Sequence, residues 1–430
     1  MNKLKEPPRP LDDIPERVPP RSADALMRAL ARDPSERFET CEAFVRELAA
    51  GYGVETPARG VPTQAVGTQL RTSETLPAAS KPRAPWWMLG VAALLLAGLF
   101  VWQPWAGGDG AAGDDGSELA TRGGSATADP DTLRDHLVWL ADPALEGRGT
   151  PKARATVADW IARWCLGVGL EPPPGREEHL ERDAGGLKNV YGWLPGAAPA
   201  ESTSATYVLV ITHYDGLGIR EGERYPSADN NGSGVAAQLE LARILIEQRD
   251  RNGPAKHGVL FAWLDGHQDA IAGAKHLAAQ PPLPLDRCVG VIGLEQLGRS
   301  LLDMVPGSLI VMGSENAPSL RSLLSPEALG PEGVLMPVGR DLYHGIPDFE
   351  PFRDKQIPGL FVLAGPSMDF GSPDDTVAKI DLPWLARRTD WLSGLVTRMA
   401  NLDERPTWVA EPTPTLEEIR AVRGALKMAE

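Results

Sequence analysis

The sequence predicts an α/β fold in which helices flank a β-sheet, with one transmembrane helix ahead of it. Between residues 189 and 401, apolar runs of strand length alternate with longer segments of helical periodicity, a pattern typical of a sheet covered by helices. Ahead of this region, residues 84–102 are uncharged and mostly apolar, and the run is long enough to cross a bilayer as a helix.

The predicted elements follow the apolar periodicity in chain order. Short apolar runs rich in β-branched residues predict strands at 189–194, 206–213, 258–265, 288–295, 308–313 and 359–364. Longer segments with helical spacing predict helices at 153–167, 232–248, 268–279, 316–325, 382–401 and 415–428.

The apolar run predicts a transmembrane helix at 84–105, with tryptophans near both of its ends. Lys81 and Arg83 precede the run and acidic residues follow it, so the positive-inside rule places the amino terminus in the cytoplasm. The large domain is then extracytoplasmic, or periplasmic. A cleaved signal peptide and a buried core helix are the alternatives, but the long segment ahead of the run and the linkers around it favour a single-pass anchor.

Linkers separate two regions that are expected to fold. Residues 53–83 and 106–129 are rich in Pro, Gly, Ser and Thr and poor in aromatic residues, which predicts a disordered juxtamembrane linker and a second flexible linker. They divide a short helical region, 1–52, from a large domain, 130–430.

The short region contains two helical periods, which the Asp33-Pro34 step interrupts. Residues 21–51, RSADALMRALARDPSERFETCEAFVRELAAG, resemble the last helices of the C-terminal lobe of bacterial serine/threonine protein kinases, including Arg37. No Gly-rich phosphate loop, lysine strand or H-R-D catalytic loop accompanies them. We therefore expect residues 1–52 to be a kinase remnant without kinase activity, and a kinase encoded upstream stays an open alternative.

Composition limits the partners of the chain. The 430 residues carry a formal net charge of -15, so a nucleic-acid partner is not expected for the large domain. The three cysteines, Cys41, Cys165 and Cys288, have no metal-like spacing. A disulfide between Cys165 and Cys288 is possible by sequence, but two buried free thiols are the favoured interpretation.

The candidate site begins in residues 206–245, TYVLVITHYDGLGIREGERYPSADNNGSGVAAQLELARIL. This segment reads as a strand ending in His213-Tyr214-Asp215, a loop carrying Asp229, and a helix opening at Gly232. The strand delivers an imidazole and a carboxylate to the carboxyl edge of a sheet, where open α/β folds place their sites. A His-x-Asp at a strand end is weak evidence when it stands alone.

The arrangement resembles the M28 family of zinc aminopeptidases. The resemblance continues through FAWLDGHQDAIAGA (261–274), VGVIGLEQLG (289–298), FEPFRDKQIPGLFVLAG (349–365) and FGSPDDTVAKID (370–381), and it spans residues 131–402. It implies a three-layer α/β/α domain with a central mixed sheet.

The resemblance also assigns one metal ion. Its ligands would be His213, Asp229 and Glu295, and Asp215 would orient the His213 ring from behind. Glu295 stands where the family has Asp, so it keeps the oxygen donor and adds a methylene. One zinc ion is therefore the expected cofactor.

Three other positions depart from the family. His267 stands at the place of the general-base Glu. Gln268 and Gly371 stand at the places of the two ligands that bind only the second metal. A neutral amide is a weaker donor and glycine offers no side chain, so a second metal is not expected. His344 could in principle replace the lost late ligand, although loop histidines are usually solvated.

These departures leave three functions open. The first is a catalytically impaired M28-like domain that binds or senses a peptide or amino-acid ligand. The second is an active one-metal zinc aminopeptidase with His267 recruited as the base, and the third is a folded spacer. The coincident changes at His267, Gln268 and Gly371 favour the first or the third.

Overall fold

The computed structural model describes residues 126–183, 185–199, 205–340, 343 and 345–412, together with seven single positions between 21 and 47. The chain splits into two compact units, Met1–Gln103 and Pro104–Glu430, and the account below concerns the second unit. The predicted transmembrane helix, the first linker, residues 106–125 of the second linker, most of the kinase-like segment and the predicted helix at 415–428 lie outside the described residues. Within the described part of the chain, no helix combines the length and apolarity needed to cross a membrane.

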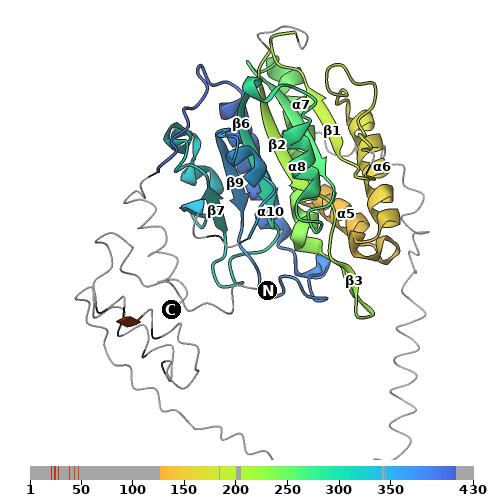
Figure 1. Cartoon of the computed structure of the whole chain (residues 1–430), viewed down its shortest axis with the longest axis vertical. Helices are drawn as coiled ribbons and strands as arrows, with labels where there is room; N and C mark the ends of the chain where they lie inside the picture. The colour runs from red at the N-terminus through yellow and green to blue at the C-terminus, as the bar shows by residue number, and fades with distance from the viewer. Residues whose placement is uncertain are drawn as a thin grey trace, which may run out of the picture. The chain divides into compact units, whose positions relative to one another are not determined.

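A seven-stranded sheet forms the centre of the domain (Figure 1). Its strand order is β1-β5-β2-β6-β9-β7-β8, and a separate hairpin pairs β3 with β4. The strand bounds are β1 Val190–Leu194, β2 Tyr207–His213, β3 Gly218–Arg220, β4 Glu223–Tyr225, β5 Gly258–Leu264, β6 Cys288–Glu295, β7 Ser308–Met312, β8 Val334–Pro337 and β9 Gly359–Leu363. The six predicted strands are confirmed to within two residues, whereas β3, β4 and β8 were not predicted because they are short and only partly buried.

Helices fill the connections between the strands. They are α5 Pro130–Leu140, α6 Pro151–Val168, α7 Gly234–Asn252, α8 Ala272–Ala279, α9 Glu350–Arg353 and α10 Leu382–Met399. The prediction missed α5, which begins at the N-cap Asp129 with Pro130 in its first turn. The segment predicted as helix at 316–325 forms only a 3₁₀ turn, Pro318–Leu323, and α7 follows a π-helical turn, Ala228–Ser233.

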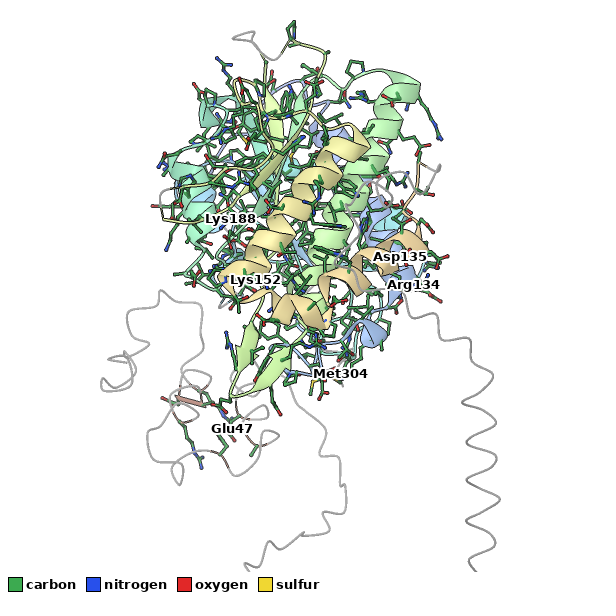
Figure 2. All side chains as sticks on the ribbon, turned by 90° about the vertical axis from the view of Figure 1, so that its right-hand side faces the viewer. Glu47, Arg134, Asp135, Lys152, Lys188 and Met304 are labelled. Atoms are coloured by element: carbon green, nitrogen blue, oxygen red, sulfur yellow. The ribbon has the colours of Figure 1, made fainter. Side chains whose placement is uncertain are left out.

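Two apolar cores confirm an α/β architecture with a central mixed sheet. Alternate side chains of β2 face opposite cores: Val208 and Val210 lie in the core that contains α5, α6, α7 and α10, while Leu209 and Ile211 lie in the core that contains α8 and α9. In Figure 2 the layer that contains α5 and α6 faces the viewer, and Arg134 on α5 and Lys152 on α6 are labelled. Strands buried on both faces are apolar throughout, so these strands could be recognised in the sequence as continuous apolar runs.

The parallel part of the sheet positions the candidate site. Strands β5, β2, β6 and β9 run parallel to one another, and β1 and β7 pair antiparallel with β5 and β9. The chain leaves β2 through α7 to β5 on one side and returns through α8 to β6 on the other side of β2. Loops therefore diverge at the carboxyl end of β2, and such a reversal of strand order opens a crevice for a ligand.

Candidate active site

His213 ends β2 and is fully buried. Its Nδ1 lies 3.1 Å from the main-chain oxygen of Asp215 and 3.4 Å from the Asp215 carboxylate, while its Nε2 has no hydrogen-bond partner. The Asp215 carboxylate also accepts the backbone N–H groups of His267 and Gln268, at 3.0 and 2.9 Å. Asp215 thus joins the end of β2 to the loop after β5 and orients the His213 ring, which is the role predicted for it.

The pKa of Asp215 reflects this network. Burial alone would raise it, but the hydrogen bond and charge of His213 and the N–H of Gln268 hold the pKa below its usual value. Asp215 is therefore an anion, and its charge contributes to the raised pKa of His267.

His267 stacks on His213, with ring centroids 3.9 Å apart and ring planes inclined by 12°. Its Nδ1 lies 2.9 Å from Oδ2 of Asp348, which belongs to the loop between β8 and α9. Burial opposes protonation of His267, but Asp348, Glu295 and Asp215 together raise its pKa to about 10. At neutral pH the ring is therefore an imidazolium that forms an ion pair with Asp348, and it is a poor general base.

Asp229 makes a different set of contacts. Its Oδ1 accepts the hydroxyl of Ser233 at 2.8 Å and the N–H of Gly298 at 2.7 Å, and the backbone N–H groups of Asp229 and Asn230 bind the two oxygens of Asp375. Burial and the nearby Asp375 raise the pKa of Asp229 to about 7. This carboxylate holds the loop before α7 together, whereas Oδ1 of the next residue, Asn230, is buried without a partner.

Glu295 ends β6 and is almost completely buried. Its Oε1 accepts a hydrogen bond from the amide of Gln296 at 3.0 Å. Its negative charge contributes to the raised pKa of His267, so the two groups are electrostatic neighbours. Glu295 is therefore at the expected edge of the sheet, although it does not join the ligand cluster described below.

The two positions predicted to have lost a second metal offer no anionic donor. The side chain of Gln268 is exposed, and its backbone N–H is bound to Asp215. Gly371 is exposed in a left-handed conformation, with φ of 67°, and no atom lies within 4 Å of where a Cβ would stand. The prediction about a second ion itself stays untested.

Three side chains could hold one cation. Ligand atoms of His213, His267 and Asp348 all lie within 4.8 Å of one another, and within the described ranges no other set of three His, Cys, Asp or Glu residues does so. Two imidazoles and one carboxylate are a donor set that suits zinc and leaves a fourth position open. Nε2 of His213 and Oδ1 of Asp348 are buried without hydrogen-bond partners, which is consistent with a ligand site.

The stacked rings show what cation binding would require. Imidazole binds a metal through a lone pair in the plane of its ring, and two nearly parallel planes cannot both contain the same ion. Tetrahedral zinc with bonds of ~2.0–2.1 Å holds its donors about 3.3 Å apart. One ring must therefore turn, and the proton between His267 and Asp348 must leave.

A buried arginine that the sequence reasoning missed positions the loops of the site. Arg148 is fully buried, and its guanidinium donates to the main-chain oxygens of Tyr214 at 2.9 Å, Leu140 at 2.6 Å, Pro226 at 3.1 Å and Ser227 at 2.6 Å. These carbonyls belong to the loop after His213 and to the segment ahead of Asp229. Arg148 thus fixes two site loops to the end of α5.

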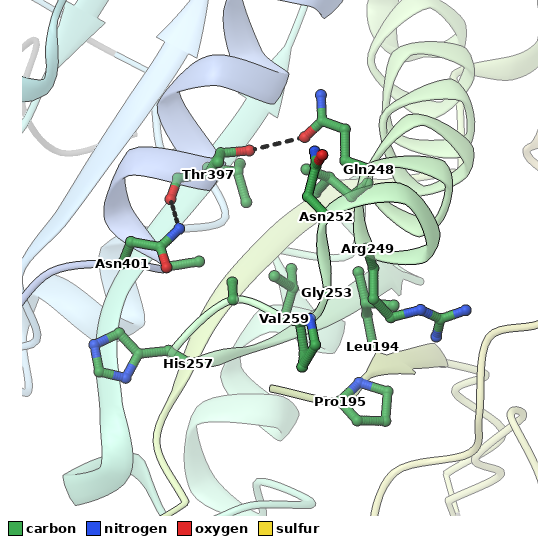
Figure 3. Close-up of a pocket in the computed structure, with 15 residues that line it drawn as sticks. Leu194, Pro195, Gln248, Arg249, Asn252, Gly253, His257, Val259, Thr397 and Asn401 are labelled. Carbon is green, nitrogen blue, oxygen red and sulfur yellow. Dashed lines mark hydrogen bonds between the residues drawn. The ribbon is translucent and has the colours of Figure 1, made fainter. Parts of the chain in front are cut away.

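The pocket in Figure 3 lies at the other end of the strands. It has a volume of about 210 Å³ and lies among β1, the start of β5 and the carboxyl ends of α7 and α10. His257 on its wall is satisfied at both ring nitrogens, by Thr206 at 2.6 Å and the main-chain oxygen of Leu402 at 2.8 Å. His257 therefore has a structural role, and none of the residues that line the pocket belongs to the His213 cluster.

The remaining histidine and cysteine predictions have mixed outcomes. His276 on α8 lies beside Glu181 and Asp183, at 3.4 and 3.8 Å. His344 lies outside the described residues. Cys165 and Cys288 are buried free thiols, as predicted.

The comparisons with known proteins agree with this geometry. Residues 189–396 match the profile of Peptidase family M28, a narrower range than the expected 131–402. No curated protein matches the chain. Nothing in the comparisons supports the kinase resemblance of residues 21–51.

Solved structures show the fold. An aminopeptidase from Aneurinibacillus sp. strain AM-1 is 23% identical, with a TM-score of 0.40 over 53% of this chain and 50% of that one. The Legionella pneumophila LapA aminopeptidase is 12% identical, with a TM-score of 0.50 over 67% and 75% of the two chains. A glutaminyl cyclase from Bacteroides thetaiotaomicron is 16% identical, with a TM-score of 0.50 over 63% and 98%.

The chain thus spans half the length of the first of these structures. The other two, with TM-scores of 0.50, support the fold alone at identities this low. The profile match covers the strands and loops that build the site, from β1 to most of α10. Residues 189–396 of this chain are therefore similar to a Peptidase family M28 domain.

Proposed function

We propose that this M28 domain is catalytically impaired and acts as a binding or sensing module for a peptide or amino-acid ligand. One observation carries the proposal: the group at the position of the general base is His267, in an ion pair with Asp348 at 2.9 Å. A base must have a free lone pair near neutral pH, and this ring is held as a cation. Loss of a positioned base alone costs ~100- to 10,000-fold in rate.

The positions of the second metal support the same proposal. Gln268 is exposed and its side chain is an uncharged amide, and Gly371 has no side chain that could bind a metal. Lewis acidity from a second ion is worth several kcal/mol to the transition state in two-metal hydrolases. Base and metal act as a unit, so their combined loss leaves little of the original reaction.

The charges that remain suit a cationic ligand group. Three acidic side chains surround the single imidazolium of His267, namely those of Asp215, Glu295 and Asp348. This surplus of negative charge favours a compact cation, such as the α-ammonium group of a peptide, over an anionic ligand. The ligand is therefore expected to present a free amino terminus.

A hydrolysis assay tests the proposal directly. The purified full chain, supplied with zinc or cobalt, should hydrolyse aminoacyl p-nitroanilides at no more than the background rate. The variant His267→Glu, Gln268→Glu, Gly371→His is the matched comparison, and it should bind more metal than the original chain. Robust turnover by the unmodified chain, lost on chelation and in His213→Ala, would show that the domain is an enzyme.

That outcome would establish the second candidate, a one-metal zinc aminopeptidase. The observation that favours it is the group formed by His213, His267 and Asp348, which contains enough donors for one ion. The nearby carboxylate of Glu295 would then be the available base, because His267 would be engaged with the metal.

We also propose a location for the domain. The apolar run at 84–105, with Lys81 and Arg83 ahead of it, supports a single-pass anchor with a cytoplasmic amino terminus and an extracytoplasmic large domain. In that arrangement the module would meet peptides outside the cytoplasm.

A further inference from the structure

We propose that the domain binds one transition-metal ion through His213, His267 and Asp348, and not through the set His213, Asp229 and Glu295 that the sequence predicts. The inference is independent of whether the domain hydrolyses peptides. It concerns which side chains hold the ion, and it moves two of the three ligands to different segments of the chain.

The first argument is the state of the donor atoms. Nε2 of His213 and Oδ1 of Asp348 are buried and lack partners, so each is costly to keep without a ligand. Nδ1 of His267 and Oδ2 of Asp348 lie 2.9 Å apart, so the two side chains are close enough to bind the same ion. The three ligand atoms already lie within 4.8 Å of one another, and one ring must turn for them to share an ion.

The second argument is the behaviour of Asp229. Its Oδ1 is used twice, by the Ser233 hydroxyl and the Gly298 N–H, and the loop around it is held by Asp375. Oδ1 is therefore committed to the loop, and Asp229 could offer an ion only its other oxygen, Oδ2. No comparable bond holds the unpaired oxygen of Asp348.

The third argument is which ring can move. The His213 ring is completely enclosed and its Nδ1 faces Asp215, so it is fixed by its orienting partner. His267 lies in the loop after β5, and 18% of its side chain is exposed. His267 is therefore the ring that turns to bring its lone pair to the ion.

The test uses the full chain without a polyhistidine tag, titrated with zinc or cobalt alone. Equilibrium dialysis should give one bound ion, and X-ray absorption at the zinc edge should count two imidazole ligands, because the set predicted from sequence would give only one. The absorption measurement needs no variant, so it decides the question even if a substitution prevents folding.

Matched variants give the second readout. His267→Ala and Asp348→Asn should each weaken zinc binding by at least about 100-fold, since even outer-shell partners of metal ligands contribute 10–100-fold. Asp229→Asn and Glu295→Gln should change it by less than about threefold. Circular dichroism of each variant in chelator checks that it is folded.

Three results would overturn the inference: no bound ion, a single imidazole in the absorption spectrum, or loss of binding in Asp229→Asn with binding retained in His267→Ala. None of these depends on the rate of peptide hydrolysis. A domain that binds no metal and hydrolyses nothing would refute this inference and leave the proposed binding role intact.

Discussion

Replacement of Arg148 by methionine should destabilise the large unit strongly, because one guanidinium serves four main-chain carbonyls inside the protein. The oxygens belong to Tyr214, Leu140, Pro226 and Ser227, at 2.6–3.1 Å. Methionine has a similar length and fills much of the same space, so the change removes the hydrogen bonds and leaves only a small cavity.

The expected magnitude follows from two opposing terms. Hydrogen bonds from a charged donor contribute about 1.5–3 kcal/mol each, so loss of the four bonds of Arg148 costs about 6–12 kcal/mol. The variant no longer buries a charge, which stabilises it by several kcal/mol relative to the original chain. This desolvation penalty is visible in Arg148 itself, because burial lowers its pKa to about 10. The net loss should therefore be about 3–5 kcal/mol in the free energy of unfolding.

Guanidinium unfolding of the full chain measures this loss. The buried Trp164 and Trp263, whose rings lie 6.4 Å apart, report the core of the large unit by fluorescence. Arg134→Met is the matched control, because Arg134 is half exposed and pairs with Asp131 on the surface of α5, where the change should cost less than about 1 kcal/mol. A loss below about 1 kcal/mol in Arg148→Met would refute the role given to this residue.

Two further predictions concern charge and location. The pKa of Asp229 is about 7 in the folded domain and 3.8 as an ordinary aspartate, so its contribution to stability is complete below pH 3.8 and is lost as the pH rises through 7. Asp229→Asn keeps the oxygen that accepts from Ser233 and Gly298. Between pH 5 and pH 8, the free energy of unfolding of this variant should therefore rise relative to that of the original chain. A difference in the free energy of unfolding that does not change with pH would contradict the raised pKa. Protease added to intact spheroplasts should digest residues 130–430 and spare residues 1–80, and the opposite pattern would reverse the proposed topology.

The sequence could predict the strands because the central ones are buried on both faces. Runs such as Tyr207–His213 and Cys288–Glu295 are continuously apolar up to their last residue, so both the strand and the placement of His213 and Glu295 at its carboxyl end were legible. The short strand Val334–Pro337 was not, since its first two residues are only half buried. Helix α5 was missed although its Asp129-Pro130 start is a recognisable cap.

The composition of the site was harder to predict. Asp348 precedes the FEPF segment that carries the M28 resemblance, but no spacing rule connects it with His267, which lies 81 residues earlier. Arg148 stands in a 3₁₀ segment far from any motif, and an arginine in a sequence reads as a surface residue. Only the packed structure reveals that its guanidinium is enclosed.

The sequence by itself determined the elements and their order, because periodicity and burial act over neighbouring residues. The residue types at His267, Gln268 and Gly371 also led to the prediction that this site does not repeat the chemistry of two metals. The tertiary structure decided which groups meet: Asp229 turns inward to Ser233 and Gly298, while His267 meets Asp348 and His213. These contacts join segments far apart in the chain, and their geometry depends on how the loops at the edge of the sheet pack together.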